Sequence, residues 1–318
     1  MLTHRNGRHV PDTTDRMKRK ESVTMRKRAT ALLLAAAVSL SLLAGCGQGG
    51  TGGSPSPTPD PTPTPEPVRV EELWLESGGK KIYGKMYLPG GEQDSYPAVI
   101  LSHGFNSSSV LNEGYAESFA KQGYAAYIFD FCGGSPSTKS DGVTTEMSVL
   151  TEYRNLSDVM DQVKALDYVD GGQLFLFGLS QGGFVSAYTA AQRPDDVKGL
   201  ILFYPAFPLQ EAYFEQYDSV DAIPDEEFET MGVPLGAIYA KDARSFDIYE
   251  EIGKYKGDVL ICHGDKDTLV PLSYSERAVE VYDSAELKVI QYGEHGFQGK
   301  LAREATGYTV EFLQAHTD

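Results

Sequence analysis

Residues 174–183 read LFLFGLSQGG, four alternating aliphatic and aromatic residues followed by a glycine-rich turn. The apolar run predicts a buried strand, and the residues that follow it predict a helix over 181–192. Between them, Gly178 to Gly182 match the pattern G-x-S-x-G in a strand–turn–helix context, which places a serine at positive φ in a sharp bend. A serine that only caps a helix would not need a glycine on both sides. Ser180 is therefore the predicted nucleophile.

Around this stretch, from Val68 to Asp318, strand-like runs alternate with amphipathic helical stretches. This pattern predicts an α/β domain with a mostly parallel sheet and helices on both faces. We expect eight strands, at 72–75, 82–88, 98–102, 125–129, 174–177, 200–203, 259–262 and 287–291. We expect helices at 113–122, 151–166, 181–192, 272–282 and 301–314. Residues 205–256 interrupt the alternation and are too many for a plain connection, so we expect a small inserted cap of short helices there.

A serine needs a base within hydrogen-bond reach before it can attack a carbonyl. Four histidines follow Cys46. His316 lies near the C-terminus, and His103 and His263 lie in His-Gly turns directly after strand runs. His295 follows the last predicted strand, in a loop that can aim an imidazole back over the sheet. His295 is therefore the predicted general base.

The base needs a carboxylate to hold its tautomer and to stabilise the imidazolium. The turn after strand 259–262 contains Asp265 and Asp267. Asp265 is closer to the strand exit and is well placed to stabilise the turn through local backbone bonds. We therefore favour Asp267, and the chain order serine, aspartate, histidine agrees with the order that accompanies this serine motif.

The oxyanion of a tetrahedral intermediate needs two fixed hydrogen-bond donors. The backbone amide of Gln181, next to the nucleophile, is the first predicted donor. The second is expected from the loop after strand 98–102, where the amide of Phe105 is best placed. Gly104 would allow that loop to approach closely.

The first 67 residues have a different composition. Arg26-Lys27-Arg28 precedes an apolar run over 29–43 that is short for a permanent membrane span, which predicts an export signal, with Met25 favoured over Met1 as the start. The residues ending at Cys46 resemble the lipobox of bacterial lipoproteins, which implies lipidation of Cys46; ordinary signal cleavage beside an incidental cysteine is the alternative. We expect an extension and signal over 1–45, a Gly/Ser/Pro/Thr-rich linker over 46–67, and one folded domain over 68–318.

Net charge and cysteine content narrow the function classes. The chain has a formal charge of −17, and because residues 1–45 hold nine basic and three acidic residues, the remainder carries −23. Such a surface excludes broad nucleic-acid binding, and it would repel anionic lipid headgroups. Three cysteines exclude a disulfide-built scaffold. The motifs described above resemble the α/β-hydrolase superfamily, whose usual strand order would separate the strands of Cys132 and Cys262 by four steps. This implies two free, mostly buried thiols.

These motifs together resemble the α/β-hydrolase superfamily over 68–318, and more narrowly the bacterial feruloyl/cinnamoyl esterases and serine-aminopeptidase-like hydrolases. The resemblance implies the α/β-hydrolase fold, Asp267 as the acid of the triad, and an inserted segment that contacts a phenolic ring through an acidic residue and a tyrosine, here Glu211 and Tyr239. At 132–135 this chain has Cys-Gly-Gly-Ser where relatives carry Gly-His-Gly. That departure weakens the case for an aromatic acyl group.

The expected function is that of an exported serine carboxylesterase, anchored by lipid on Cys46 to the outer face of a bacterial membrane. Its expected partner is a small ester, with no nucleic acid, cofactor or metal, and with no other membrane attachment; nothing in the sequence indicates an oligomeric state. A serine peptidase or lysophospholipase with the same triad is the first alternative. A non-catalytic binding lipoprotein of the same fold is the second.

Overall fold

The computed structural model describes residues 66–91 and 93–318. Its main sheet has eight strands in the order β1-β4-β6-β5-β7-β8-β11-β12, of which β1 and β4 are antiparallel to their neighbours and the other six are parallel. The predicted fold class is confirmed. The strands are β1 (Arg69–Glu72), β4 (Gly84–Leu88), β5 (Tyr96–Ser102), β6 (Ala125–Phe129), β7 (Val169–Leu179), β8 (Gly199–Phe203), β11 (Asp258–Gly264) and β12 (Ala285–Ile290).

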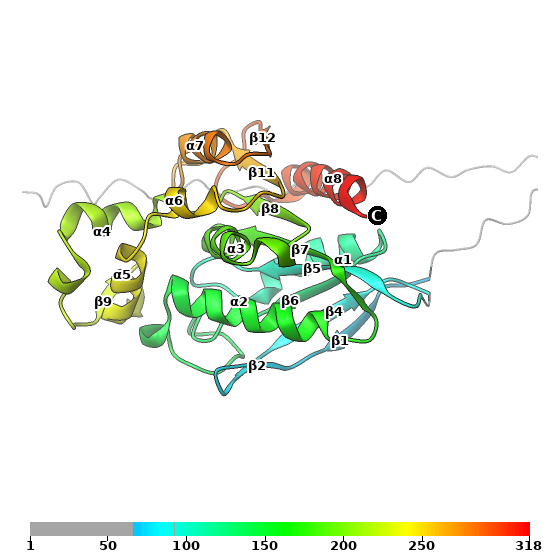
Figure 1. Ribbon diagram of the computed structural model, residues 1–318, viewed down its shortest axis with the longest axis horizontal. Helices are drawn as coiled ribbons and strands as arrows, with labels where there is room; N and C mark the ends of the chain where they lie inside the picture. Colours follow the sequence, from blue (N-terminus) through cyan, green and yellow to red (C-terminus); the bar gives the residue numbers. More distant parts are fainter. Residues whose placement is uncertain (1–65, 92) are drawn as a thin grey trace, which may run out of the picture. The chain divides into compact units, whose positions relative to one another are not determined.

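Helices cover both faces of this sheet. Alternate side chains of β5 enter different cores, since Ile100 packs with one buried cluster and Leu101 with the other. On the Leu101 face lie α1 (Glu113–Ala120) and α8 (Gly299–His316). On the Ile100 face lie α2 (Val149–Lys164), α3 (Gln181–Gln192), α6 (Ile248–Ile252) and α7 (Ser273–Val281). Figure 1 shows α2 and α3 side by side over the strands.

Strand register determines which loops meet. In the parallel pair of β5 and β7, Ser102 lies opposite Gly178, so the loop after β5 and the turn after β7 leave the same edge of the sheet side by side. The loops after β11 and β12 leave that edge as well, because both strands run parallel to β7 and β8. All five predicted triad and oxyanion residues lie in these four connections or directly after them.

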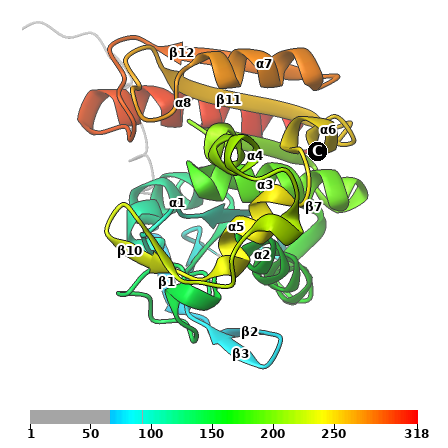
Figure 2. The same cartoon turned by 90° about the vertical axis from the view of Figure 1, so that its left-hand side faces the viewer.

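Residues 205–256, called the cap from here on, connect β8 to β11. They contain α4 (Glu211–Gln216), α5 (Ala237–Arg244) and α6, together with a hairpin of β9 (Phe228–Thr230) and β10 (Val233–Leu235). The hairpin was not expected from the sequence. Its two-residue turn, Met231-Gly232, has φ of 52° and 78°, the positive values that tight antiparallel turns require. In Figure 2, α5 lies between α2 and α4.

Two strand predictions at the start of the domain were right only in part. The expected strand 72–75 shares Glu72 with β1 and Leu75 with β2 (Leu75–Ser77), and the expected strand 82–88 contains β4 but is divided from β3 (Lys80–Ile82) at Tyr83. At the division, the Tyr83 amide donates to Ser140 Oγ and its carbonyl accepts from the Asp130 amide, so long-range bonds replace strand pairing there. All of β1 is solvent-exposed, so it lacks the alternation that a sequence pattern would show.

The structure also bears on the expectations for the cysteines, and it describes part of the chain for which membrane spans, metal sites and domain boundaries were considered. Cys132 and Cys262 are free and buried, and four strand steps separate β6 from β11, as predicted. No helix in 66–91 and 93–318 is both long and apolar enough to cross a bilayer. Within the same ranges, no group of three acidic, histidine or cysteine side chains could hold a metal ion. The predicted signal, Cys46 and the linker up to 65 lie outside the described residues, so those boundaries stay predictions.

Candidate active site

Ser180 occupies the sharp turn between β7 and α3. Its backbone has φ of 52° and ψ of −116°, a region that residues with side chains rarely adopt. Glycines make the turn sterically feasible: a Cβ at Gly178 would lie 2.3 Å from the Gly182 carbonyl oxygen, and one at Gly182 would lie 2.4 Å from the carbonyl oxygen of His103. The Ser180 amide donates to the Phe203 carbonyl at 3.0 Å, which ties the turn to β8. The strain is therefore held by the surrounding backbone.

Ser180, His295 and Asp267 form one hydrogen-bonded chain. His295 Nε2 lies 2.9 Å from Ser180 Oγ, and its Nδ1 lies 2.7 Å from Asp267 Oδ2. Because a carboxylate only accepts, Nδ1 carries the hydrogen and Nε2 is left free to accept the serine proton. The Asp267 side chain is fully buried, whereas 20% of the His295 side chain is exposed. The buried carboxylate thus fixes the orientation of the imidazole, while part of the ring stays accessible to solvent.

The two aspartates of the 265–267 turn have different partners. Asp267 Oδ1 accepts from the amides of Leu269 and Val270, both at 2.9 Å, which leaves Oδ2 for the histidine. Asp265 Oδ1 instead accepts from the Tyr292 amide at 2.5 Å, and so ties its own turn to the loop that carries His295. The geometry therefore places Asp267 in the chain and Asp265 in a bracing position.

The predicted oxyanion loop lies against the serine. A Cβ at Gly104 would lie 3.2 Å from Ser180 Cβ, so this glycine permits the close approach. Among the described residues, the backbone amides of Phe105 and Gln181 donate to no other protein atom. Two amides without protein partners, flanking one nucleophile, form an arrangement that can bind a developing negative charge.

His103 holds that loop in place, a role the sequence did not reveal. Its Nε2 accepts from the Phe131 amide at 3.1 Å, so its Nδ1 carries the hydrogen and donates to the Gly104 carbonyl at 2.8 Å. Complete burial lowers the pKa of His103, which favours this neutral ring.

Comparison with known proteins supports the fold described above. A family model described as "Serine aminopeptidase, S33" matches residues 93–223. The structure of Est1E from Butyrivibrio proteoclasticus with bound ferulic acid superposes with a TM-score of 0.70 at 26% identity, covering 77% of this chain and 98% of that one. The chain therefore has the α/β-hydrolase fold.

Curated proteins that this chain resembles include esterases and other serine hydrolases. The human palmitoyl-protein thioesterase ABHD10 is 27% identical over 232 residues, 68% of this chain and 72% of that protein. The putative esterase YitV of Bacillus subtilis is 21% identical over 235 residues, 69% of this chain and 89% of that protein. The mouse serine hydrolase BPHL is 25% identical over 180 residues, 51% of this chain, and the match spans only 60% of that relative's length. The curated proteins to which this chain is similar are thus serine hydrolases and esterases.

The two residues expected to contact a substrate ring have different hydrogen-bond partners in the structure. Tyr239 is 4% exposed, and its hydroxyl donates to Gln181 Oε1 at 2.5 Å. Glu211 lies on the surface of the cap, where its carboxylate accepts from the Tyr274 hydroxyl at 2.5 Å. In the part of the chain that the structure describes, no hydrogen bond joins the two.

Two buried groups beside the site were missed by sequence reasoning. His263 Nε2 lies 2.8 Å from the Val270 carbonyl and 3.3 Å from Asp267 Oδ2, so a second histidine contacts the triad aspartate. Glu152, in α2, accepts from Gln181 Nε2 at 2.8 Å. Burial raises the pKa of Glu152 to about 8, although the Gln181 bond opposes part of that rise. A glutamate in an amphipathic helix ordinarily indicates an exposed position, so the sequence carried no signal for Glu152.

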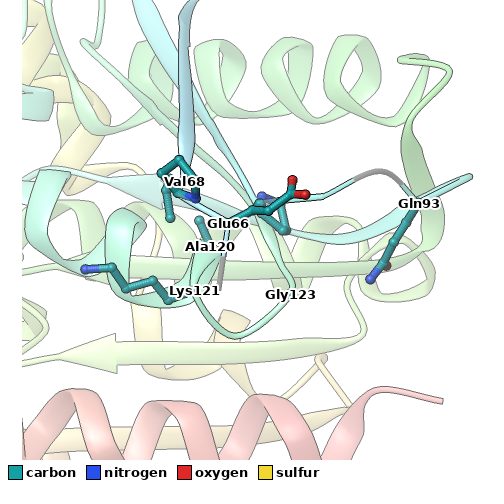
Figure 3. Close-up of a pocket in the computed structure, with 9 residues that line it drawn as sticks. Glu66, Val68, Gln93, Ala120, Lys121 and Gly123 are labelled. Carbon is teal, nitrogen blue, oxygen red and sulfur yellow. The ribbon is translucent and has the colours of Figure 1, made fainter. Parts of the chain in front are cut away.

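A pocket of about 610 Å³ lies away from this constellation, lined by Glu66, Pro67, Val68, Pro89, Gly90, Gln93, Ala120, Lys121 and Gly123 (Figure 3). Gly123 precedes β6, so the pocket is beside the amino end of that strand. Ser180 and its partners follow the carboxyl ends of their strands. We therefore assign the pocket no part in the site.

Proposed function

We propose that this α/β hydrolase is a serine carboxylesterase. The observation that carries the proposal is the continuous chain from Ser180 Oγ through His295 to Asp267. Beside it lie two backbone amides that have no partner within the described part of the protein. Hydrolysis of an ester requires an activated hydroxyl, a base that can return its proton, and donors for an oxyanion. The site contains a group suited to each requirement.

In the proposed mechanism, Ser180 Oγ attacks the ester carbonyl while His295 Nε2 accepts the hydroxyl proton. Asp267 stabilises the resulting imidazolium and, held by two backbone amides, keeps the ring oriented. The amides of Phe105 and Gln181 bind the oxyanion. The intermediate then collapses to an acyl-serine as His295 gives its proton to the departing alcohol. Water, activated by the same histidine, releases the acid and restores Ser180.

The substrate we propose is a neutral ester with an apolar acyl group. Phe105, Tyr213 and Phe228 are partly buried at the edge of a small apolar cluster in the cap, next to the proposed oxyanion loop. Est1E, which shares this fold, holds ferulic acid in its solved structure, and this supports an aromatic acyl group for the present chain. The negative charge of the domain gives no attraction to acidic substrates.

We further propose that the enzyme works outside the cell, attached through lipid on Cys46. Support comes from the basic and apolar residues before Cys46 and from the proline-rich residues after it. Incorporation of a radiolabelled fatty acid into the full chain, lost on Cys46→Ser, would test this. Labelling that survives the substitution would contradict it.

A peptidase is the second candidate, because the matching family model is described as a serine aminopeptidase. A panel of p-nitrophenyl esters, run beside aminoacyl p-nitroanilides, separates the two. We expect ester hydrolysis, and covalent labelling by a fluorophosphonate that disappears in Ser180→Ala. Hydrolysis of the anilides alone would favour the peptidase, and labelling that persists in Ser180→Ala would overturn the assigned nucleophile.

A further inference from the structure

The proposed mechanism uses the backbone amide of Gln181 but leaves its side chain unexplained. That side chain is 1% exposed and is bonded at both ends of its amide group. Its Nε2 donates to Glu152 Oε2 at 2.8 Å, and its Oε1 accepts from the Tyr239 hydroxyl at 2.5 Å. Glu152 belongs to the core helix α2 and Tyr239 to the cap helix α5. The residue after the nucleophile is therefore held between the core and the cap.

Tyr239 also contacts the other proposed oxyanion residue. Its ring packs against that of Phe105 with centroids 6.0 Å apart at an interplanar angle of 67°, an edge-to-face contact. One buried side chain of the cap thus contacts both residues whose amides flank Ser180. The helix that carries it is anchored in turn, since Ser148 Oγ, at the start of α2, donates to Asp242 Oδ2 in α5 at 2.5 Å.

These contacts matter because the turn at Ser180 is strained. The peptide between Ser180 and Gln181 is held at one end, where the Ser180 carbonyl accepts from the amides of Phe184 at 3.1 Å and Ala206 at 2.9 Å. The hydrogen bonds of the Gln181 side chain add a constraint at the other end, on the residue whose amide would bind the oxyanion. The position of an oxyanion donor must be accurate to within tenths of an ångström if it is to hydrogen-bond the developing charge. A side chain fixed by two hydrogen bonds provides such a constraint.

We propose that Glu152 and Tyr239 are positioning residues, which fix Gln181 and Phe105 so that their amides converge on the oxyanion. This rests on the proposed esterase function. It replaces the expectation that Tyr239 binds the substrate, because its hydroxyl is already used within the protein. Glu152 serves here as a hydrogen-bond acceptor, and an amide oxygen in the same place can do the same.

The test uses steady-state kinetics on the p-nitrophenyl ester that the wild-type protein hydrolyses fastest. Glu152→Leu removes the acceptor at similar volume, and Tyr239→Phe removes only the hydroxyl. For each we expect kcat to fall at least about tenfold with KM within twofold of wild type, because a transition-state contact is weakened and ground-state binding is not. Glu152→Gln keeps an acceptor oxygen, and should restore kcat to within about threefold of wild type.

Tyr255→Phe is the matched control. Tyr255 is fully buried and its hydroxyl donates to the Val197 carbonyl at 3.0 Å, remote from Ser180, so this variant loses a comparable bond. Its kcat should match wild type. If Glu152→Leu does not fold, as judged by circular dichroism, Tyr239→Phe decides alone.

Three outcomes would overturn the proposal. Unchanged kcat in Tyr239→Phe would do so, as would a raised KM with unchanged kcat, which would indicate substrate binding. A Glu152→Gln variant as slow as Glu152→Leu would exclude a role as an acceptor. Absence of both ester hydrolysis and fluorophosphonate labelling in the wild-type protein would instead overturn the proposed function, and this proposal with it.

Discussion

Replacing Glu152 by glutamine should change how the stability of the protein depends on pH. Glu152 is 1% exposed, and burial raises the pKa of its carboxyl from the usual 4.5 to about 8. Glutamine has the same shape and offers the same acceptor oxygen to Gln181, but it has no proton to lose. The substitution therefore removes one titration while it preserves the packing.

The sign follows from proton counting. Between pH 4.5 and about 8 the folded protein keeps the Glu152 proton, whereas the unfolded chain has released it. The folded state binds more protons over this window, so the free energy of unfolding decreases as pH rises through it. Each pH unit is worth about 1.4 kcal/mol, which sets an upper limit of about 5 kcal/mol for the whole window. Below pH 4.5 the contribution is fully present, and above about 8 it is lost.

Differential scanning calorimetry of wild type and Glu152→Gln at pH 5 and pH 9 measures this effect. Other titrating groups are common to both proteins, so they cancel in the difference between them. From pH 5 to pH 9 the wild type should lose about 4 kcal/mol more than the variant, about 10 °C in relative Tm for a domain of this size. If both proteins show parallel pH curves, Glu152 is not a buried neutral acid and the reasoning fails.

Three further expectations concern the turn, the aspartates and the thiols. Asp267→Asn should lower kcat about 10⁴-fold through the wrong histidine tautomer, whereas Asp265→Asn should cost less than about tenfold, both measured by ester hydrolysis. Gly182→Ala should lower the free energy of unfolding in urea by at least about 2 kcal/mol, because the added methyl meets backbone oxygens at 2.4 and 2.5 Å. Cys132 and Cys262 should react with a thiol reagent only after unfolding, because burial raises the pKa of both, that of Cys132 to about 11.

The positions of Ser180, His295 and Asp267 could be predicted because each depends on a local rule. A strained turn needs glycines at fixed offsets, and the ends of parallel strands meet at one edge whatever lies between them. The sequence alone therefore predicts that three residues separated by up to 115 positions lie together. The two aspartates were harder to separate, because both bind backbone amides and only the structure shows which has an oxygen free for His295.

The sequence predicted an inserted cap over 205–256, but not its hairpin or its side-chain contacts, because those contacts follow no sequence periodicity. The resemblance implies that Tyr239 contacts a substrate ring, but it gives no sign that the Tyr239 hydroxyl donates to Gln181, as it does in the structure. The β9–β10 hairpin is short, and a glycine after Met231 was its only signal. Segments that pack against the rest of a domain through single side chains have weak sequence patterns, since each contact depends on the partner's position.

The protonation state of Glu152 is a second property that the sequence does not predict. A carboxylate beside the Gln181 side chain would place a negative charge close to the oxyanion that the neighbouring amide has to stabilise, and the two charges would repel each other strongly in a buried site. A carboxylic acid that keeps its proton avoids that repulsion, and it still offers an oxygen to Gln181. Whether the proton stays depends on burial by α2, α3 and α5 together, which is a property of the assembled fold. The sequence alone does not distinguish a buried glutamate that must stay uncharged from a glutamate that is exposed to solvent.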